Sequence, residues 1–422
     1  MSSLAIENIG LLLTNDPQLG SGMLGAVENA SITFEEGVVA EIGPAGSAQA
    51  DRHVDAGGRC VMPGFVDSHT HLVFAGDRSR EFAARMAGEP YSAGGIRVTV
   101  EATRAAGRDE LAGLTDRRRR EAIRAGITHT EIKSGYGLDI PSELRCLEVA
   151  AGFTDDVTFL GAHVVPAGFE DRADDYVELV CGEMLAACAP HARWIDVFCE
   201  VGAFDREQSR RVLEAGREAG LGLRVHGNQL GPGPGVQLAV EMGAASVDHC
   251  TYLEDADLDA LASGSTVATF LPATDFSTRQ PYPDARRAID AGVEVAIATN
   301  TNPGSSNTTA MGFCLALAVR DMGMTIEEAI RAATLGGAAA LGRTDIGRLA
   351  PGARADAILL ETIAELLPGM VRIAAPGAWL VASGLLAERE DEALLTLAAG
   401  GFAPKRILRE GQWIAILCER PG

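Results

Sequence analysis

The sequence is poor in aromatic residues and in positive charge, and each shortage argues against a class of protein. Only 5% of its 422 residues are aromatic, whereas 47% are hydrophobic, with Ala, Gly, Val and Leu abundant. This composition favours helices packed tightly on a parallel sheet over a β-sandwich. The formal net charge of −22 disfavours nucleic acid and membrane surfaces as partners. The one basic run, Arg117 to Arg120, lies between Asp116 and Glu121, which is typical of a solvated helix face.

Paired cysteines and long apolar runs are also missing. The eight cysteines are scattered and form no Cys-x-x-Cys motif, which indicates buried thiols in a reducing compartment. The N-terminus has no basic n-region, and no apolar stretch is long enough to span a bilayer. We therefore expect a cytoplasmic protein with neither a signal peptide nor a membrane span. The length of the chain fits a large barrel plus a smaller unit.

Beyond residue 58, apolar runs rich in β-branched residues alternate with longer helical stretches. The runs span residues 61–67, 126–132, 157–163, 194–200, 222–226, 245–249, 266–272 and 293–300. Eight strands alternating with helices predict an α/β fold, a (β/α)8 TIM barrel over residues 59–345.

The two ends of the chain carry a different pattern. Residues 1–58 read as strands and tight turns, with a hairpin signal at residues 31–42. A turn and a strand follow residue 346. We expect residues 1–58 and the first part of 346–422 to form one small β domain built from both chain ends. The remainder is a tail without a clear period.

The first run ends in two histidines, His69 and His71, separated by one residue. Side chains at i and i+2 of a strand point the same way, so both imidazoles can reach one metal ion. For an isolated pair, two ordinary loop histidines would be the simpler interpretation. Here His163, His226 and His249 also lie at the ends of runs. Barrel enzymes build their active sites on that face, so the pattern predicts a catalytic metal site.

These motifs resemble the amidohydrolase superfamily and, within it, the imidazolonepropionase family. The resemblance covers residues 58 to 360 and includes the His-x-His strand end and the histidines after strands five and six. It also includes FAGDR at 74–78, EIKSGYG at 131–137, GAH at 161–163 and NPGSS at 302–306. The EIKSGYG and NPGSS segments are specific, whereas His-x-His alone is not.

The resemblance implies a metal-dependent hydrolase of histidine degradation. Such an enzyme breaks the cyclic amide C–N bond of 4-imidazolone-5-propanoate and forms N-formimidoyl-L-glutamate. The family implies one zinc or iron ion per chain and a small anionic cyclic amide as substrate, and a homodimer would suit it. Carried over by position, the metal ligands are His69, His71 and His226, the substrate-binding residues are Arg78, Tyr136, His163, Asn302, Gly304 and Ser305, and the residue near the reacting water is His249.

Two of these positions have simpler alternatives. Arg78 could instead form a surface ion pair with Glu81, since exposed pairs are common and weak. His163 could be a structural histidine that is merely hydrogen-bonded.

The sequence departs from the family at Asn300 and Gln229. Asn300 stands where the family has an aspartate that binds the metal and accepts a proton. An amide oxygen can still coordinate a metal, but it carries no charge and takes no proton from water. We therefore expect weaker metal binding and slower catalysis, with His249 partly substituting. Gln229, a candidate catalytic and substrate-binding residue, stands where many members carry glutamate, and glutamine can still hydrogen-bond the ring. The tail after Glu361 also leaves the family pattern.

Other functions remain open at this point. One is another amidohydrolase, such as a deaminase, a cyclic amidase or a dipeptidase-like enzyme. Lys133 raises a two-metal variant, because a carboxylated lysine can bridge metals, but its place on the second run rather than the fourth argues against that. The third is a homologue that binds its ligand without turning it over, because of Asn300.

Overall fold

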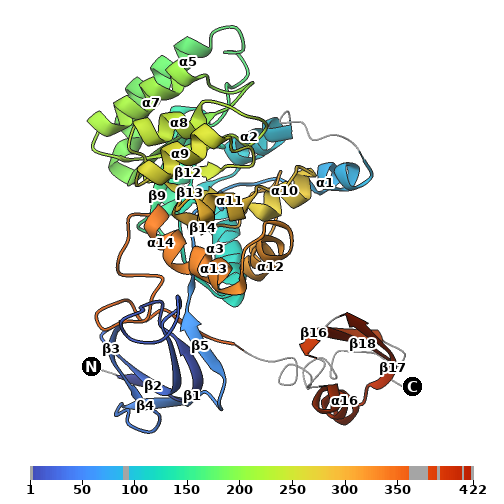
Figure 1. Cartoon of the computed structure of the whole chain (residues 1–422). Coiled ribbons are helices and arrows are strands. Elements are labelled where there is room, and N and C mark those ends of the chain that lie inside the picture. Colours follow the sequence, from blue (N-terminus) through green and yellow to red (C-terminus); the bar gives the residue numbers. More distant parts are fainter. Residues whose placement is uncertain (1–2, 89–94, 361–378, 387–389, 411–412, 420–422) are drawn as a thin grey trace.

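A computed structural model describes residues 3–88, 95–360, 379–386, 390–410 and 413–419. Parallel strands and covering helices form the barrel at the top of Figure 1. Its neighbouring strands run in the order β14-β13-β12-β11-β10-β9-β8, and β6 pairs in parallel with β7. The strands are β6 Phe65–Asp67, β7 Ile127–Thr130, β8 Ile132–Lys133, β9 Val157–Ala162, β10 Trp194–Cys199, β11 Gly222–Gly227, β12 Ser246–His249, β13 Val267–Phe270 and β14 Val295–Ile297. Each lies within one of the predicted runs or extends one residue past it, so the predicted fold class is confirmed.

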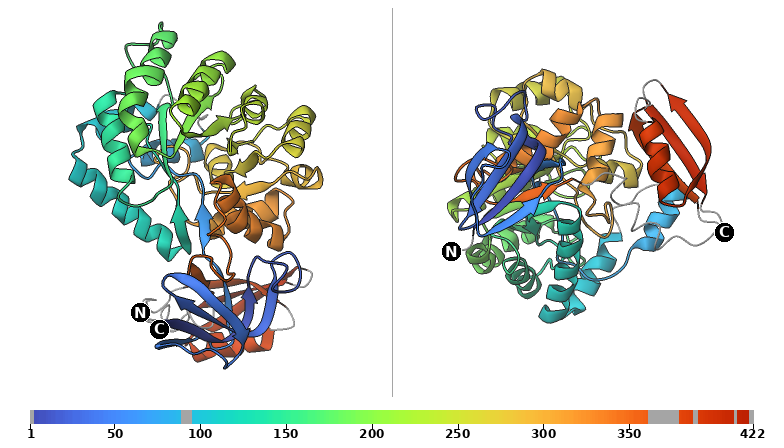
Figure 2. Two further views of the ribbon diagram at one scale, coloured as in Figure 1. Left: turned by 90° about the vertical axis from the view of Figure 1, so that its left-hand side faces the viewer. Right: turned by 90° about the horizontal axis from the view of Figure 1, so that it is seen from below.

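Helices surround these strands, as Figure 2 shows in two further views. They are α1 Ser79–Met86, α2 Ile96–Ala105, α3 Arg108–Arg124, α4 Ile140–Ala150, α5 Ala173–Leu179, α6 Leu185–Cys188, α7 Arg206–Glu218, α8 Gly235–Glu241, α9 Asp255–Ser263, α10 Pro272–Thr278, α11 Ala285–Asp290, α12 Met311–Asp321, α13 Ile326–Arg331 and α14 Gly337–Ala340. Local sequence sets several of their starts. Asp205 and Gln208 form a capping box at α7, and Thr325 and Glu328 form one at α13. Among the described residues, no helix has the length and apolarity to cross a bilayer.

The joint between the first and eighth strands differs from the others. No strand ladder joins β6 to β14 in the described residues. Instead, both carboxylate oxygens of Asp67 accept hydrogen bonds from Thr299, one from its backbone N–H at 3.0 Å and one from its hydroxyl at 2.6 Å. Just beyond, the N–H of Asn300 donates to the carbonyl of His69 at 3.0 Å, and that of His71 donates to Thr301 at 2.9 Å. The barrel is therefore closed at the level of the predicted site residues.

A second sheet lies below the barrel in Figure 1. Its order is β15-β5-β1-β2-β3, and β4 also pairs with β1. The hairpin of β2 and β3 falls where the sequence predicts one, and β15 adds antiparallel to β5. This sheet thus joins strands from the first 63 residues to one strand that follows residue 345. The strands are β1 Leu4–Leu13, β2 Ala26–Glu35, β3 Val38–Pro44, β4 Arg52–Asp55, β5 Cys60–Pro63 and β15 Ala357–Leu359.

The tail contains a third sheet. Its elements are β16 Trp379–Leu386, α16 Glu390–Ala399, β17 Ala403–Glu410 and β18 Trp413–Glu419. The strands are antiparallel, in the order β16-β18-β17. Figure 1 draws this unit apart from the other two. The sequence alone did not predict this small folded unit.

Candidate active site and metal centre

Four imidazole rings gather at the C-terminal ends of the barrel strands. One ring nitrogen from each of His69, His226 and His249 lies within 4.8 Å of the others. The ring of His71 is next to this set, with its centroid 5.3 Å from that of His69 and 5.6 Å from that of His226. All four side chains are buried. The structure thus brings together the residues of the predicted metal site, with His249 closer to two of them than the sequence suggested.

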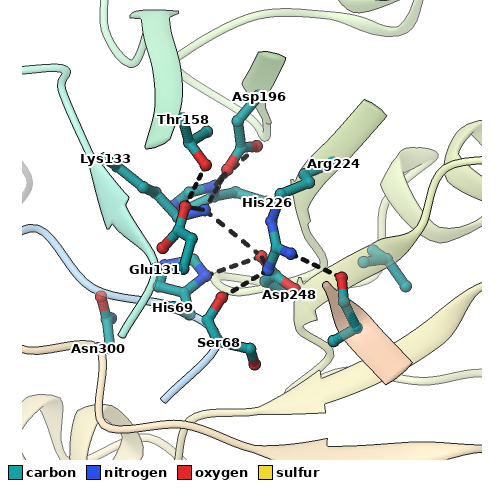
Figure 3. Close-up of polar contacts among 12 residues, drawn as sticks. Ser68, His69, Glu131, Lys133, Thr158, Asp196, Arg224, His226, Asp248 and Asn300 are labelled. Atoms are coloured by element: carbon teal, nitrogen blue, oxygen red, sulfur yellow. Dashed lines mark hydrogen bonds and ion pairs between the residues drawn. The ribbon is translucent and has the colours of Figure 1, made fainter. Parts of the chain in front are cut away.

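Carboxylates fix the orientation of two of these rings (Figure 3). Nδ1 of His69 lies 2.7 Å from Oδ2 of Asp248, and Nδ1 of His226 lies 3.0 Å from Oδ1 of Asp196. Each Nδ1 therefore carries the proton and donates it to the carboxylate. The Nε2 atoms of both rings are buried without a hydrogen-bond partner. A carboxylate behind a histidine is the common second partner of a metal-binding imidazole.

Burial keeps three of the four imidazoles neutral. Burial lowers the pKa of His69, His71 and His249 well below the ordinary histidine value. Metal binding requires the neutral form of histidine, so this shift leaves the rings ready to coordinate. Nδ1 of His71 and Nδ1 of His249 are also buried without a partner.

A buried ionic network lies against the rings. Lys133, one of the two lysines in the sequence, lies 2.9 Å from Glu131 and 2.8 Å from Asp196. Arg224 lies 3.0 Å from Asp248 and donates to the carbonyl of Ser68. Figure 3 shows both cations among these contacts.

The same network sets the charge of its acids. Burial alone would raise the pKa of Asp248, but Arg224 and His69 hold it well below the usual range. Burial likewise acts against Asp196, yet His226 and Lys133 keep the pKa of that carboxyl low. Burial dominates at Glu131, whose pKa is raised. The two carboxylates that orient the histidines are therefore held in the charged form.

Asn300 completes the cluster from the end of strand eight. It is 2% exposed and has φ = 51°, a left-handed conformation that Asn and Asp adopt more readily than most residues. Its Nδ2 donates to Oγ1 of Thr274 at 2.8 Å, and its Oδ1 is buried without a partner. His249 is also strained, with φ = 86°.

A pocket opens beside the histidine cluster. Its walls include His71, His226, His249 and Asn300. Six of the predicted substrate residues also line it: Arg78, Tyr136, His163, Gln229, Asn302 and Ser305. The seventh, Gly304, is not part of this lining. It lies against Arg78, where an added Cβ would come within 2.2 Å of the guanidinium.

The position of Arg78 distinguishes its two interpretations, a substrate-binding residue and a surface ion pair with Glu81. It does pair with Glu81, through contacts of 2.9 Å and 2.6 Å. However, its side chain is only 4% exposed and it lines the pocket, so the pair is not a surface pair. Glu81 instead fixes the guanidinium plane at the pocket wall.

His163 and Tyr136 form an aromatic side of the pocket. The ring of His163 stacks on that of His71 at 5.3 Å and 18°. Its Nδ1 donates to the carbonyl of Gly135 at 2.9 Å, so its Nε2 is an acceptor. Burial, reinforced by nearby His226, lowers the pKa of His163 to about 4. Tyr136 lies 5.4 Å from His163 and 5.8 Å from His71 between ring centroids.

Several residues that support the site were not predicted from the sequence. Asp196, Arg224 and Asp248 each interrupt an apolar strand with a charge, and this interruption was the available signal. Glu200 accepts hydrogen bonds from the backbone of Gln229 and Leu230 at 2.8 Å and 3.0 Å, which holds the pocket loop. Thr274 follows strand seven and had no such signal.

The donor set suits a metal ion. Buried nitrogens of His69, His226 and His249 with no hydrogen-bond partner converge, and the unpartnered amide oxygen of Asn300 belongs to a residue that lines the same pocket. Nitrogen and oxygen ligands of this kind bind zinc and iron.

Comparisons with known proteins agree with this geometry. Residues 60–380 match the Amidohydrolase family. The imidazolonepropionase of Salinispora arenicola is 63% identical over 369 residues, 87% of this chain and 94% of that protein. The imidazolonepropionase of Mycolicibacterium smegmatis is 59% identical over 387 residues, 91% of this chain and 96% of that protein. Residues 355–421 also match the family model of Ribosomal protein L11 methyltransferase (PrmA).

Solved structures of lower identity share the fold. Atrazine chlorohydrolase from Arthrobacter aurescens, complexed with zinc, has a TM-score of 0.60 and 19% identity, and the match covers 84% of this chain and 86% of that one. An adenosine deaminase from Xanthomonas campestris with bound zinc has a TM-score of 0.62 and 20% identity, with 86% and 85% covered. On the family match and the identities above, the chain belongs to the amidohydrolase family and, within it, to the imidazolonepropionases.

Proposed function

We propose that the chain hydrolyses 4-imidazolone-5-propanoate to N-formimidoyl-L-glutamate. The observation that carries this proposal is the cluster of buried histidines that opens into a pocket with one buried arginine. The identity of more than half of all aligned residues with imidazolonepropionases supports the choice of substrate.

We propose that one zinc or iron ion per chain binds to His69, His71, His226 and Oδ1 of Asn300. When bound, such an ion acts as a Lewis acid that makes water nucleophilic near neutral pH. Asp248 and Asp196 hold the Nδ1 protons of His69 and His226, so these rings present Nε2 to the ion.

His249 is the candidate proton carrier. Its imidazole is neutral and can accept a proton from the attacking water, which the amide of Asn300 cannot do. The same imidazolium then returns the proton to the ring nitrogen as the C–N bond breaks. The water oxygen ends in the new carboxylate of the product.

Arg78 is the candidate partner of the propanoate carboxylate. Its guanidinium is held by Glu81 and faces a pocket in a protein with a net charge of −22, where few other groups attract an anion. Guanidinium groups match carboxylates with two parallel hydrogen bonds. Tyr136, His163 and Gln229 lie where they can hold the ring.

A direct assay tests the reaction. Purified protein loaded with zinc or iron is mixed with 4-imidazolone-5-propanoate, the loss of imidazolone absorbance is followed, and the product is identified by mass spectrometry. N-formimidoyl-L-glutamate as product supports the proposal. An unchanged imidazolone together with turnover of an aminopurine or a dipeptide would instead favour the deaminase or the dipeptidase-like alternative.

The ligand assignment can be tested separately from activity. We expect His71→Gln to lower the metal content of the purified protein and His249→Gln to retain the metal while losing most of the rate. Elemental analysis and the absorbance assay give the two readouts. Metal loss in His249→Gln with retention in His71→Gln would exchange the two roles.

A further inference from the structure

Asn300 has two chemically different ends at its amide, and only one can bind a cation. The carbonyl oxygen Oδ1 is an acceptor, whereas the NH2 group of Nδ2 is a donor that repels a metal ion. An aspartate has an oxygen at both ends and needs no such choice. Something in this chain must therefore turn the amide the right way.

The backbone of Asn300 leaves the side chain little freedom. Its N–H donates to the carbonyl of His69 at 3.0 Å, and its own carbonyl accepts from Nδ2 of Asn302 at 2.7 Å. The residue is 2% exposed. Its Cα and Cβ are thus fixed beside the histidine cluster, and only rotation of the amide remains.

Thr274 engages one end of that amide. Its hydroxyl oxygen accepts from Nδ2 of Asn300 at 2.8 Å, and Thr274 is itself only 1% exposed. It lies in the first turn of α10, a rigid element after strand seven. The other end, Oδ1, is buried without a partner in the residue that lines the pocket with His71, His226 and His249.

We propose that Thr274 is a positioning residue that holds Nδ2 of Asn300, so that Oδ1 faces the histidine cluster as a metal ligand. This inference rests on the metal site proposed above. A threonine hydroxyl can accept or donate, so it accepts from the amide here and would donate to a carboxylate in an Asn300→Asp variant. Thr274 therefore matters more to this chain than it would with an aspartate at position 300.

The test measures metal affinity and needs no substrate. The full chain is stripped with a chelator and titrated with Zn²⁺ against a chromophoric chelator. We expect Thr274→Val, which removes the hydroxyl and keeps the shape, to weaken zinc binding by about 10–100-fold, the usual range for the partner of a metal ligand. Thr274→Ser should stay near the wild type, because it restores the hydroxyl.

A double-mutant cycle isolates the orientation of the amide. In the Asn300→Asp background both ends of the side chain are oxygen, so we expect Thr274→Val to weaken zinc binding there by less than about threefold. Thr266→Val is the matched control. It removes another buried threonine hydroxyl, which donates to the carbonyl of Ala244. Thr266 precedes β13, whereas Thr274 follows it.

Each outcome decides the inference. A loss in Thr274→Val no larger than in Thr266→Val overturns it, and so does an equal loss in the wild-type and Asn300→Asp backgrounds. If Thr274→Val does not fold, Thr274→Ala deletes the same hydroxyl and is judged by the same criteria. A wild type that binds zinc in this way but does not open the imidazolone ring would refute the proposed reaction and leave this inference standing.

Discussion

Asn300 is the residue where this chain departs most from the chemistry its fold supports. By the resemblance described above, this neutral amide stands at the end of strand eight where the family carries an aspartate that accepts a proton. Its left-handed φ of 51° suits Asn as well as Asp, so the backbone does not resist the exchange in either direction. The consequence of the amide is therefore electrostatic rather than structural.

We predict that Asn300→Asp raises kcat by about 10²–10⁴, the usual contribution of a positioned general base. The same change should tighten metal binding, because a carboxylate adds charge to the ligand set. Loss of imidazolone absorbance measures the rate. Asn307→Asp, at an exposed asparagine of the same loop, is the matched control and should leave the rate unchanged.

The rates of the wild type and of Asn300→Asp also distinguish an active enzyme from a homologue that only binds its ligand. Activity in Asn300→Asp with none in the wild type would identify a homologue that binds its ligand without turnover. No gain in the aspartate variant would mean that His249 alone moves the proton as fast as it does with an aspartate beside it, and our view of position 300 would be wrong.

Asp275 lies beside Thr274, and we expect its buried carboxyl to make the free energy of unfolding depend on pH. Its Oδ1 accepts from the hydroxyl of Thr251 at 2.8 Å, and its Oδ2 is buried without a partner. Burial raises its pKa from 3.8 to about 7, although the Thr251 bond acts in the opposite direction. The folded state thus binds this proton more tightly than the unfolded state, so stability is lost as the pH rises from about 4 to about 7.

We expect Asp275→Asn to unfold at higher urea than the wild type above pH 7. The amide keeps the shape without the charge, and the gain is at most about 4 kcal/mol. It should shrink to nothing as the pH falls toward 4. Urea unfolding at pH 5 and pH 8 measures the difference, with the exposed Asp255→Asn as control. An equal gain at both pH values would show that titration of Asp275 is not the cause.

At the residue scale, the sequence indicated which histidines meet but not their distances. The His-x-His spacing and the strand-end positions of His226 and His249 predict one cluster, and the rings do gather. The choice between His71 and His249 depends on backbone geometry such as the φ of 86° at His249. Such a conformation is imposed by the surrounding structure, and no local pattern encodes it.

At the scale of elements, the strands were predictable because each is an apolar run bounded by turns. β9, β10, β12 and β13 are buried along their whole length, so they need no alternation to be recognised. The partners of Asp196, Arg224 and Asp248 were not predictable. Pairing among charged residues on neighbouring strands depends on register, which the sequence of one strand does not contain.

Lys133 connects three of these strands and should be critical to their stability. It contacts Glu131 beside β8, Asp196 on β10 and, at 3.8 Å, Asp248 on β12. Removal of one partner from a buried ion pair leaves an uncompensated charge and costs about 3–5 kcal/mol. We predict a loss of this size in Lys133→Met, measured by urea unfolding of the metal-free protein.

The matched control for that prediction is Arg320→Met. The Arg320 side chain is 82% exposed, and its contact with Asp321 is 3.9 Å long. Its removal should change the free energy of unfolding by no more than about 0.5 kcal/mol. Equal losses in the two variants would mean that the buried network adds little to the stability of the barrel.

At the scale of the whole molecule, the chain combines parts of different character. We propose a barrel over residues 59–345 and a small β domain from residues 1–58 and the start of 346–422. The pairing of β15 with β5 supports a β domain built from both chain ends, although β5 places residues 60–63 in the small sheet rather than in the barrel. The sheet of β16, β17 and β18 lies in the segment that resembles a methyltransferase family, and it forms no ladder with the other described strands. The sequence did not reveal this unit, because β16 and β18 mix large and small apolar residues without a period.

We predict two separable unfolding transitions when the full chain is heated in a calorimeter. A bound ion stabilises the folded state of the part that holds it, by about 2.7 kcal/mol at a concentration 100-fold above Kd. Removal of the metal with a chelator should therefore lower the transition of the barrel by a few degrees and leave that of the tail unchanged. A single transition that shifts as a whole would show that the tail unfolds together with the barrel.

The joint between β6 and β14 gives the barrel one further property. Its backbone bonds run from the N–H of Asn300 to His69 and from the N–H of His71 to Thr301, and three of these residues are among the proposed metal ligands. A ligand that binds these side chains together would also hold the first barrel strand against the last. An ion bound there would link the first strand to the last across a joint that no strand ladder spans in the described residues, so loss of the ion would also loosen the closure of the barrel.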